Sequence, residues 1–271
     1  RIFKRNKMKK YLVIGNPIDH SLSPKLHNFW IKQNNINAIY NKKKLNDDEI
    51  KNLILDIREN KISGINVTVP FKNKVIPFLD ELSLGAKQTQ SVNTIFMKDN
   101  KVIGDNTDIG GFESAIKKLD FDLSKKTAFI LGAGGVVPSI IYALLKMGVS
   151  KILISNRTET KAENIKKLFN NIQIVSWGEI PEFDIIINGT SVGLDNNDQI
   201  GLDFSKVGKN KLFYDVIYNP NQTNFLKTAK QLGNKFENGK LMFIFQALLS
   251  FKLWHNLEPE VNDKTMKLLD V

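Results

Sequence analysis

The sequence predicts an α/β protein of two domains, with a doubly wound parallel sheet in the second domain. Short apolar runs with little alternation recur along residues 127–217, as is typical of parallel strands that are covered on both faces. Stretches with helical spacing separate these runs, and strands that alternate with helices form parallel βαβ units. The residues up to Asp120 form a separate block with its own strands and helices, so the 271 residues are expected to divide into two domains.

The first block is expected to contain three strands, three helices and a hairpin. The strands are predicted at 11–15, 38–43 and 65–69, and the helices at 23–34, 47–60 and, broadly, 72–82. Ser23 is a candidate N-cap because Pro24 would then occupy the first helical position. Residues 93–105 are predicted to form a β-hairpin with 98–100 as its turn.

The second block is expected to alternate strands with helices. Its strands are predicted at 127–131, 151–155, 172–176, 184–188 and 212–217. Helices are predicted at 136–147, where Gly148 ends the helix, and at 158–169. A last helix over 241–256 is so apolar that we expect it to be buried.

The charge composition bears on whether the protein binds nucleic acid. The chain carries 39 Lys and Arg against 28 Asp and Glu, a formal net charge of +11. The lysines are dispersed among asparagines, with dense runs only at the N-terminus and at 42–44, and no nucleic-acid recognition motif occurs. We therefore expect no nucleic-acid partner, although binding driven by charge alone stays open as an alternative.

Several kinds of site and location are also excluded or disfavoured. Cysteine is absent, which rules out disulfides, thiolate nucleophiles and cysteine-ligated zinc, and we expect no metal site. No apolar run reaches the roughly 18 residues that a membrane span needs. The basic N-terminal segment lacks the apolar stretch and cleavage site of a secretory signal, which predicts a cytoplasmic protein. Met8 is a candidate for the natural start, and the start residue stays open.

A glycine cluster between the strand at 127–131 and the following helix predicts a dinucleotide site. Gly132 would make the tight turn, and Gly134, with Ala133 and Gly135 beside it, would let a pyrophosphate approach the backbone. The N–H groups at the start of the helix would bind the anion. Val137 replaces the third glycine of the usual pattern, so an ordinary glycine-rich turn is the alternative.

The end of the next strand indicates which nucleotide is bound. An NAD site places an acid there for the ribose hydroxyls, whereas this chain has Asn156, Arg157 and Thr158. A guanidinium can pair with a 2′-phosphate, so we predict NADP as the cofactor. The alternative is a surface arginine beside a helix that Thr158 caps.

Short polar side chains gather at the chain turns of the first block. Asn66 and Thr68 would share one face of a strand, and Lys72 follows Pro70 two residues later. Buried polar groups on one face are costly unless they find partners, so we expect this face to bind a small hydroxylated acid. Lys72 and Asp108 are candidates for proton transfer, against the alternatives of a solvated lysine and a helix N-cap.

These motifs together resemble the shikimate dehydrogenase family. The resemblance rests on IDHSLSPKLHN, GINVTVPFK, SVNTI, GDNTDIGGF, GAGG, SNRT and YNPNQTNFL, in this order and spacing, followed by a helical Gln246. It covers residues from about 11 to 260. It implies NADP-dependent, reversible reduction of 3-dehydroshikimate to shikimate in aromatic amino-acid biosynthesis.

The resemblance also implies roles for individual residues. Lys72 and Asp108 correspond to the catalytic pair, and the substrate-binding residues would be Ser21, Ser23, Asn66, Thr68, Lys72, Asn93, Asp108, Tyr218 and Gln246. The cofactor-binding residues would be Gly132, Ala133, Gly134, Gly135, Asn156, Arg157, Thr158 and Gly239. Two features depart from the family pattern. An expected arginine after GAGG is missing from Val136–Ser139, and Leu241 replaces a glycine.

The family organisation implies a substrate-binding catalytic domain of residues 8–109 with the C-terminal helices 241–271. Residues 110–240 would form a Rossmann-like NADP domain, with the active site in the cleft between the two and a monomer or homodimer as the assembly. Two further alternatives stay open. One is a relative that oxidises quinate as well, perhaps with NAD, and the other is a nucleotide-binding protein without catalysis.

Overall fold

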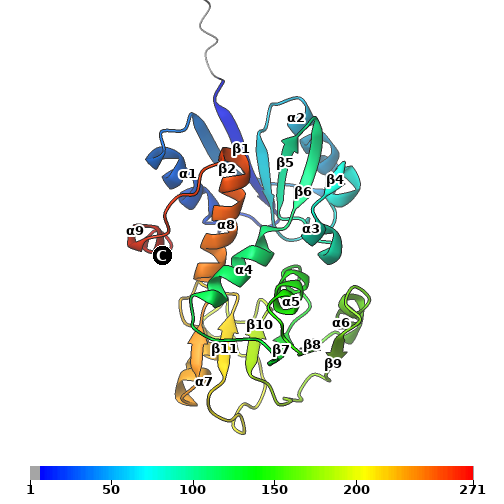
Figure 1. Cartoon of the computed structure of the whole chain (residues 1–271), viewed down its shortest axis with the longest axis vertical. Helices are drawn as coiled ribbons and strands as arrows, with labels where there is room; N and C mark the ends of the chain where they lie inside the picture. The colour runs from blue at the N-terminus through cyan, green and yellow to red at the C-terminus, as the bar shows by residue number, and fades with distance from the viewer. Residues whose placement is uncertain (1–6, 271) are drawn as a thin grey trace, which may run out of the picture. The chain divides into compact units, whose positions relative to one another are not determined.

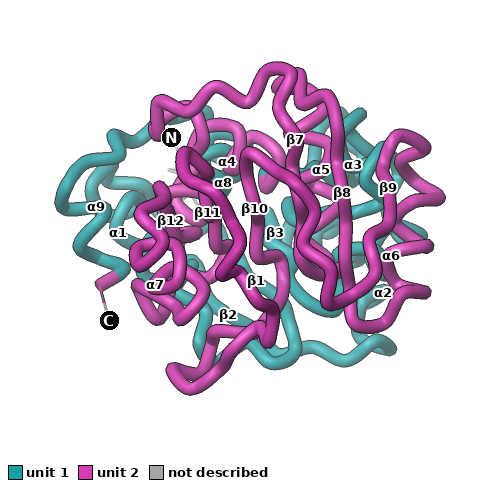
Figure 2. The backbone as a smooth tube through the Cα atoms, turned by 90° about the horizontal axis from the view of Figure 1, so that it is seen from below, with its two compact units in different colours: residues 1–107, 246–269 teal, residues 108–245, 270–271 magenta. Residues whose placement is uncertain are grey.

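The protein is described here by a computed structural model, which covers residues 7–270. Residues 1–6 of the basic N-terminal segment, which is predicted not to be a secretory signal, lie outside the described residues. The chain forms two compact units (Figure 2). Unit 1 comprises residues 1–107 and 246–269, and unit 2 comprises residues 108–245 and 270–271. In residues 7–270 no helix is long and apolar enough to cross a membrane.

Unit 1 is built on a mixed six-stranded sheet (Figure 1). Its strands are β1 (Lys9–Gly15), β2 (Ala38–Lys44), β3 (Gly64–Val67), β4 (Glu81–Leu82), β5 (Thr94–Lys98) and β6 (Lys101–Asp105), in the order β2-β1-β3-β5-β6-β4. Strands β1, β2 and β3 are parallel to one another, and β5 is antiparallel to both β3 and β6. The last residues of β1, β3 and β6 and the first residue of β5 therefore lie at one edge of the sheet.

Helices cover both faces of this sheet. The helical segments of unit 1 are α1 (Ser23–Gln33), η1 (Asp47–Glu49), α2 (Ile50–Arg58), η2 (Ile76–Phe78), α3 (Leu84–Thr89) and α9 (Asp263–Lys267), and α8 (Lys240–His255) contributes its part from Gln246 onward. Ile65 of β3 packs in a core cluster with Ile54 and Ile57 of α2. The neighbouring Asn66 points the other way and bonds Ser250 of α8. Because successive strand residues face opposite sides, α2 and α8 cover opposite faces.

Several local predictions for unit 1 are wrong. Residues 72–82 do not form a helix, because Pro77 lacks an N–H and only the short η2 forms before β4. Strand β3 ends at Val67, so Thr68 lies just beyond it. Leu22, not Ser23, occupies the N-cap position of α1, and its side chain makes no cap hydrogen bond.

The hairpin prediction is confirmed, with a shorter turn. Lys98 and Lys101 pair directly across β5 and β6, which leaves Asp99 and Asn100 as a two-residue loop. Both loop residues have positive φ, 50° and 60°, the conformation that tight hairpin turns require.

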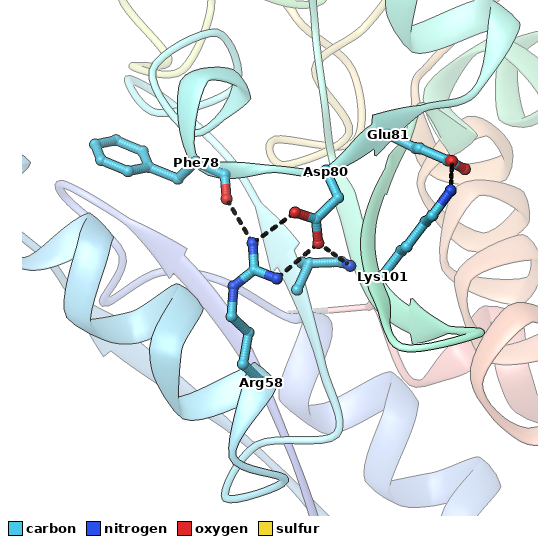
Figure 3. A network of polar contacts seen from close by, with 6 residues as sticks. Arg58, Phe78, Asp80, Glu81 and Lys101 are labelled. Atoms are coloured by element: carbon cyan, nitrogen blue, oxygen red, sulfur yellow. Dashed lines mark hydrogen bonds and ion pairs between the residues drawn. The ribbon is translucent and has the colours of Figure 1, made fainter.

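A polar network joins the segment before β4 to its neighbours (Figure 3). Arg58 of α2 donates to both carboxylate oxygens of Asp80, at 2.7 and 2.9 Å, and to the carbonyl of Phe78 at 3.4 Å. The Val102 N–H also donates to Asp80, at 2.7 Å. Hydrogen bonds from Arg58, then from Val102, lower the pKa of Asp80 to about 2. The network therefore fixes this irregular segment against both α2 and β6.

Unit 2 contains the predicted doubly wound sheet. Its strands are β7 (Thr127–Leu131), β8 (Lys151–Ser155), β9 (Ile172–Ile174), β10 (Ile185–Asn188), β11 (Leu212–Asp215) and β12 (Lys235–Glu237). They are all parallel, in the order β12-β11-β10-β7-β8-β9. The chain order reverses between β7 and β10, and ligands of such sheets bind outside the carboxyl ends of the strands at this switch point.

Apolar side chains fill both faces of the second sheet. The helices of unit 2 are α4 (Thr107–Lys117), which begins at the last residue of unit 1, α5 (Val137–Lys146), α6 (Glu159–Lys166) and α7 (Asn224–Gln231), and α8 contributes Lys240–Phe245. Ala128 and Ile130 of β7 pack in one core cluster, and the alternate residues Phe129 and Leu131 pack in another. Both clusters are buried, which explains why this strand is a continuous apolar run.

Candidate functional site

Most of the first-block residues singled out from the sequence lie at one edge of the unit 1 sheet. Ser21 and Ser23 follow β1, and Thr68 and Lys72 follow β3, which is parallel to β1. Asn93 precedes β5, and Thr107 follows β6. Strand directions thus bring together side chains from four separate segments.

The β1 and β3 ends are in close contact. The Thr68 N–H donates to the carbonyl of Ile14 at 2.9 Å, which extends the pairing beyond the end of β3. A Cβ atom on Gly15 would lie 2.6 Å from Cγ2 of Thr68, so only glycine permits this approach. On the α1 side, the backbone N–H of buried Ser23 donates to Oγ of Ser21 at 3.4 Å. Both serines are thus held at the start of α1.

Asn66 is buried and bonded on every side. Its Nδ2 donates to the Asn93 carbonyl at 3.0 Å, to Thr94 Oγ1 at 3.1 Å and to Ser250 Oγ at 3.0 Å. Its Oδ1 accepts from the Tyr40 hydroxyl at 2.7 Å. The amide protons are therefore used within unit 1, and an Oδ1 lone pair is what Asn66 retains for a ligand.

Asn93 is oriented by the start of α4. The Thr107 N–H donates to Asn93 Oδ1 at 2.7 Å, and because an N–H can only donate, the amide oxygen must face it. Asn93 Nδ2 then donates to Thr107 Oγ1 at 2.8 Å and to Gln246 Oε1 at 3.4 Å. The structure thus brings together two of the residues that the family resemblance implicates, Asn93 and Gln246, in direct hydrogen-bond contact.

The two catalytic candidates belong to different units. Lys72 is half-buried in the turn after β3, and its carbonyl accepts from the Val92 N–H at 2.8 Å. Asp108 is buried and occupies the first turn of α4, directly after Thr107. The helix begins at Thr107 rather than near Gly111, so Asp108 lies inside the helix and does not cap it.

The glycine loop of unit 2 has the backbone of a phosphate-binding turn. Gly132 has φ of +101°, and a Cβ there would lie 2.7 Å from Thr190 Cγ2, so a larger residue is excluded. Gly134 and Gly135 are exposed and precede α5. Pro138 lies in the first turn of α5, where its missing N–H removes no helical hydrogen bond. The loop therefore places exposed glycine backbone at the positive end of a helix dipole.

The loop after β8 adjoins the glycine loop. The Gly132 N–H donates to the Ser155 carbonyl at 2.8 Å, as expected for the ends of neighbouring parallel strands. Asn156 Nδ2 donates to the Thr158 carbonyl at 2.7 Å. Thr158 is the N-cap residue of α6, but its side chain makes no cap hydrogen bond. Arg157 is exposed and has no carboxylate partner within residues 7–270, so its guanidinium is available to an anion.

The segments after β11 and β12 meet at the same edge of the second sheet. The Gly239 N–H donates to the Ile217 carbonyl at 3.1 Å, and a Cβ on Gly239 would lie 2.0 Å from the Val216 carbonyl oxygen. Tyr218 packs on Phe243 with ring centroids 4.8 Å apart, and burial raises the pKa of its hydroxyl to about 12. Leu241 lies in the first turn of α8, a conformation that requires no glycine.

A buried carboxylate ties these loops to β10. Asp215 accepts from Asn188 Nδ2 at 3.1 Å, from the Ile217 N–H at 3.0 Å and from the Thr223 hydroxyl at 2.6 Å. Burial raises the pKa of Asp215 to about 6, although these three hydrogen bonds oppose the shift. Asp215 was not predicted from the sequence, although an acid at the end of an apolar strand was a signal for it.

Sequence reasoning also missed the residues that hold the unit 1 site. Tyr40, Thr94 and Ser250 all take part in the buried network around Asn66. A weak signal existed for Ser250, which lies one helical turn after Gln246 in an otherwise apolar helix. The described chain contains no cluster of three or more histidine, aspartate or glutamate side chains that could hold a metal ion.

Comparison with known proteins gives matches over both halves of the chain. Residues 13–95 match the model of the shikimate dehydrogenase substrate binding domain, and residues 113–196 match the model of shikimate / quinate 5-dehydrogenase. A curated relative from Pelagibacter ubique, shikimate dehydrogenase (NADP(+)), is 57% identical over 263 residues, which cover 97% of this chain and 99% of the relative.

Solved structures resemble the chain over a similar length. Shikimate 5-dehydrogenase from Thermus thermophilus, crystallised with NADP(H) and shikimate, is 30% identical with a TM-score of 0.86, covering 96% of this chain and 97% of that one. The ligand-free 5-ketofructose reductase of a Gluconobacter species is 27% identical with a TM-score of 0.89, covering 98% and 99%.

Proposed function

Because the chain belongs to the shikimate dehydrogenase family, we propose that it catalyses the NADP-dependent, reversible reduction of 3-dehydroshikimate to shikimate, a step of aromatic amino-acid biosynthesis. The observation that carries this proposal is the 57% identity to an NADP(+)-dependent relative over nearly the full length of both chains. The edges of both sheets support it, because each gathers polar or glycine-rich segments suited to one of the two ligands.

We propose the following roles for the residues of unit 1. Ser21 and Ser23 bind the carboxylate of the substrate. Asn66, Thr68, Asn93 and Gln246 bind its ring hydroxyls and the reacting oxygen, to which Lys72 and Asp108 also bind. The support is the gathering of these segments at one sheet edge and the contact of Asn93 with Gln246 there.

For the cofactor, the proposed residues are Gly132, Ala133, Gly134, Gly135, Asn156, Arg157, Thr158 and Gly239, with Tyr218 near the substrate. Two observations indicate that these residues fit NADP. The Gly132 conformation and the start of α5 suit a pyrophosphate, and the Arg157 guanidinium suits a 2′-phosphate. An acid that would repel a 2′-phosphate does not follow β8.

The chemistry divides between the cofactor and the protein. When bound, NADPH supplies the hydride that reduces the C3 carbonyl carbon of the substrate. Lys72 delivers the proton to the carbonyl oxygen as the C–H bond forms, and in the reverse direction it removes the hydroxyl proton. Asp108 is the second member of the proposed catalytic pair and binds the reacting oxygen of the substrate. The remaining polar side chains orient the ring so that a single carbonyl faces the cofactor.

We also propose the domain organisation and the setting of the enzyme. Residues 8–109 with 241–271 form the substrate-binding catalytic domain, and residues 110–240 form the NADP domain. The protein acts in the cytoplasm as a monomer or homodimer, on small molecules and without a nucleic-acid or membrane partner.

The test is a turnover assay that follows the absorbance of NADPH. We expect shikimate to reduce NADP+ rapidly, with slower reduction of NAD+ and little activity on quinate. Because the Gluconobacter relative is a 5-ketofructose reductase, 5-ketofructose is the informative competing substrate. It would be assayed in the reductive direction with NADPH. No turnover of shikimate, or faster turnover of 5-ketofructose than of 3-dehydroshikimate, would refute the proposed substrate.

A further inference from the structure

We propose that Tyr40 is a positioning residue of the substrate site: its hydroxyl fixes the buried amide of Asn66 and, through it, the polar network that orients further substrate-binding side chains. The inference rests on the proposed function. Tyr40 lies in the middle of the edge strand β2 and is 1% exposed. Its hydroxyl donates to Asn66 Oδ1 at 2.7 Å. This bond connects β2 to β3, two strands that do not pair with each other.

The direction of each proton follows from the partners. Asn66 Nδ2 faces the Asn93 carbonyl, which can only accept, so the amide oxygen of Asn66 must face Tyr40. The Tyr40 hydroxyl therefore donates its proton to Asn66.

The bond to Asn66 extends the effect to the rest of the site. Asn66 Nδ2 donates to Ser250 Oγ, which lies 2.7 Å from Thr94 Oγ1 and 3.1 Å from Thr107 Oγ1. Thr107 in turn orients Asn93, as described above, and the Ser250 hydroxyl donates to the Gln246 carbonyl at 3.1 Å. The orientation of the proposed ligand-binding amides thus depends on a continuous buried network that begins at Tyr40.

Water cannot replace the tyrosine hydroxyl, because Asn66 and Ser250 are 6% and 0% exposed. Removing the oxygen leaves Asn66 Oδ1 without the donor that Tyr40 supplies, and the amide can then tilt. The ring itself would stay in place, since it stacks on His27 with centroids 4.2 Å apart and planes 2° apart. A change to phenylalanine therefore isolates the hydroxyl.

The experiment compares Tyr40→Phe with Tyr11→Phe. Tyr11 is a matched control: it lies on the adjacent strand β1 in register with Tyr40, is 2% exposed and has no proposed role in binding. For both variants we would measure kcat, the KM of shikimate and of NADP+, the Kd of shikimate by calorimetry and the melting temperature.

For Tyr40→Phe we expect the KM and Kd of shikimate to rise about three- to tenfold, the range for one lost hydrogen bond. We expect the kcat and the KM of NADP+ to stay within about twofold, and Tyr11→Phe to change neither shikimate constant.

Three other outcomes would overturn the inference, each for a different reason. If both variants melt earlier but bind shikimate normally, Tyr40 is a structural residue and the inference is overturned. A rise in the shikimate KM for both variants would show general loosening of unit 1 and would also overturn it. If the unaltered protein fails to turn over shikimate at all, the proposed function fails first, and this inference falls with it.

Discussion

Acidification should destabilise unit 1 through His27. This histidine is 1% exposed in α1, and neither ring nitrogen has a hydrogen-bond partner within residues 7–270. Aromatic rings surround it, with Tyr40 stacked at 4.2 Å and Trp254 at 5.5 Å between centroids. Burial, and then repulsion from His255, lower the pKa of His27 to about 3. The folded protein therefore keeps this ring neutral.

The sign and size of the effect follow from the two pKa values. An unfolded histidine has a pKa of about 6.5, so below this pH the unfolded chain binds a proton that the folded chain does not. The stabilising contribution is therefore complete above about pH 6.5 and is lost as the pH falls toward 3. Each unit of pKa difference is worth about 1.4 kcal/mol, which gives about 2 kcal/mol lost by pH 5 and at most about 5 kcal/mol by pH 3.

The assay is urea unfolding at about pH 7.5, 6 and 5, followed by tryptophan fluorescence. Two of the three tryptophans, Trp30 and Trp254, lie beside His27, so the signal reports mainly on unit 1. His27→Phe cannot be protonated, and we expect its free energy of unfolding to fall by about 2 kcal/mol less than that of the unaltered protein between pH 7.5 and 5.

His20 provides the matched control because it is exposed and lies a few residues away in the same segment. His20→Phe should leave the pH dependence unchanged. The reasoning is refuted if His27→Phe and the unaltered protein lose the same free energy on acidification, or if His20→Phe flattens the pH dependence as much as His27→Phe does.

Three further substitutions test the site and the fold. Lys72→Ala should lower kcat by about 10²- to 10⁴-fold with a smaller change in KM, and a nearly normal kcat would remove Lys72 from the mechanism. Arg157→Ala should raise the KM of NADPH about 10- to 100-fold and leave NADH unaffected, whereas equal effects would contradict the 2′-phosphate assignment. Gly239→Ala should destabilise the protein by about 3 kcal/mol in thermal unfolding, because its Cβ would lie 2.0 Å from the Val216 carbonyl oxygen. Gly208→Ala, whose Cβ meets nothing nearer than 4.0 Å, is the control, and equal melting temperatures would disprove the steric argument.

The regular elements could be predicted where local pattern and tertiary environment agree. The strands at 127–131 and 151–155 have the predicted bounds, because both are continuous apolar runs in the interior of a parallel sheet. The hairpin was also found, since Asp99 and Asn100 tolerate positive φ. The predicted helix at 72–82 failed because its apolar spacing reflects packing of an irregular segment, which Arg58 and Asp80 hold in place.

The polar network of unit 1 could not be predicted in the same way. Asn66 and Ser250 are 184 residues apart in the chain, and Tyr40 and Asn66 are 26 residues apart. Their hydrogen bonds depend on which strands become neighbours and on where α8 packs, and neither is encoded in a local window. The sequence indicated that Asn66 needed buried partners, but only the fold identifies them.

The position of Ser250 in the chain has a consequence for synthesis on the ribosome. The strands that carry Asn66 and Thr94 emerge early, but the hydroxyl that joins them belongs to α8, which is translated more than 150 residues later. Until α8 is synthesised, their buried amide and hydroxyl groups lack one of their native partners, so unit 1 cannot complete its folding. A message truncated before α8 should therefore yield a first sheet that chaperones and proteases recognise as unfinished.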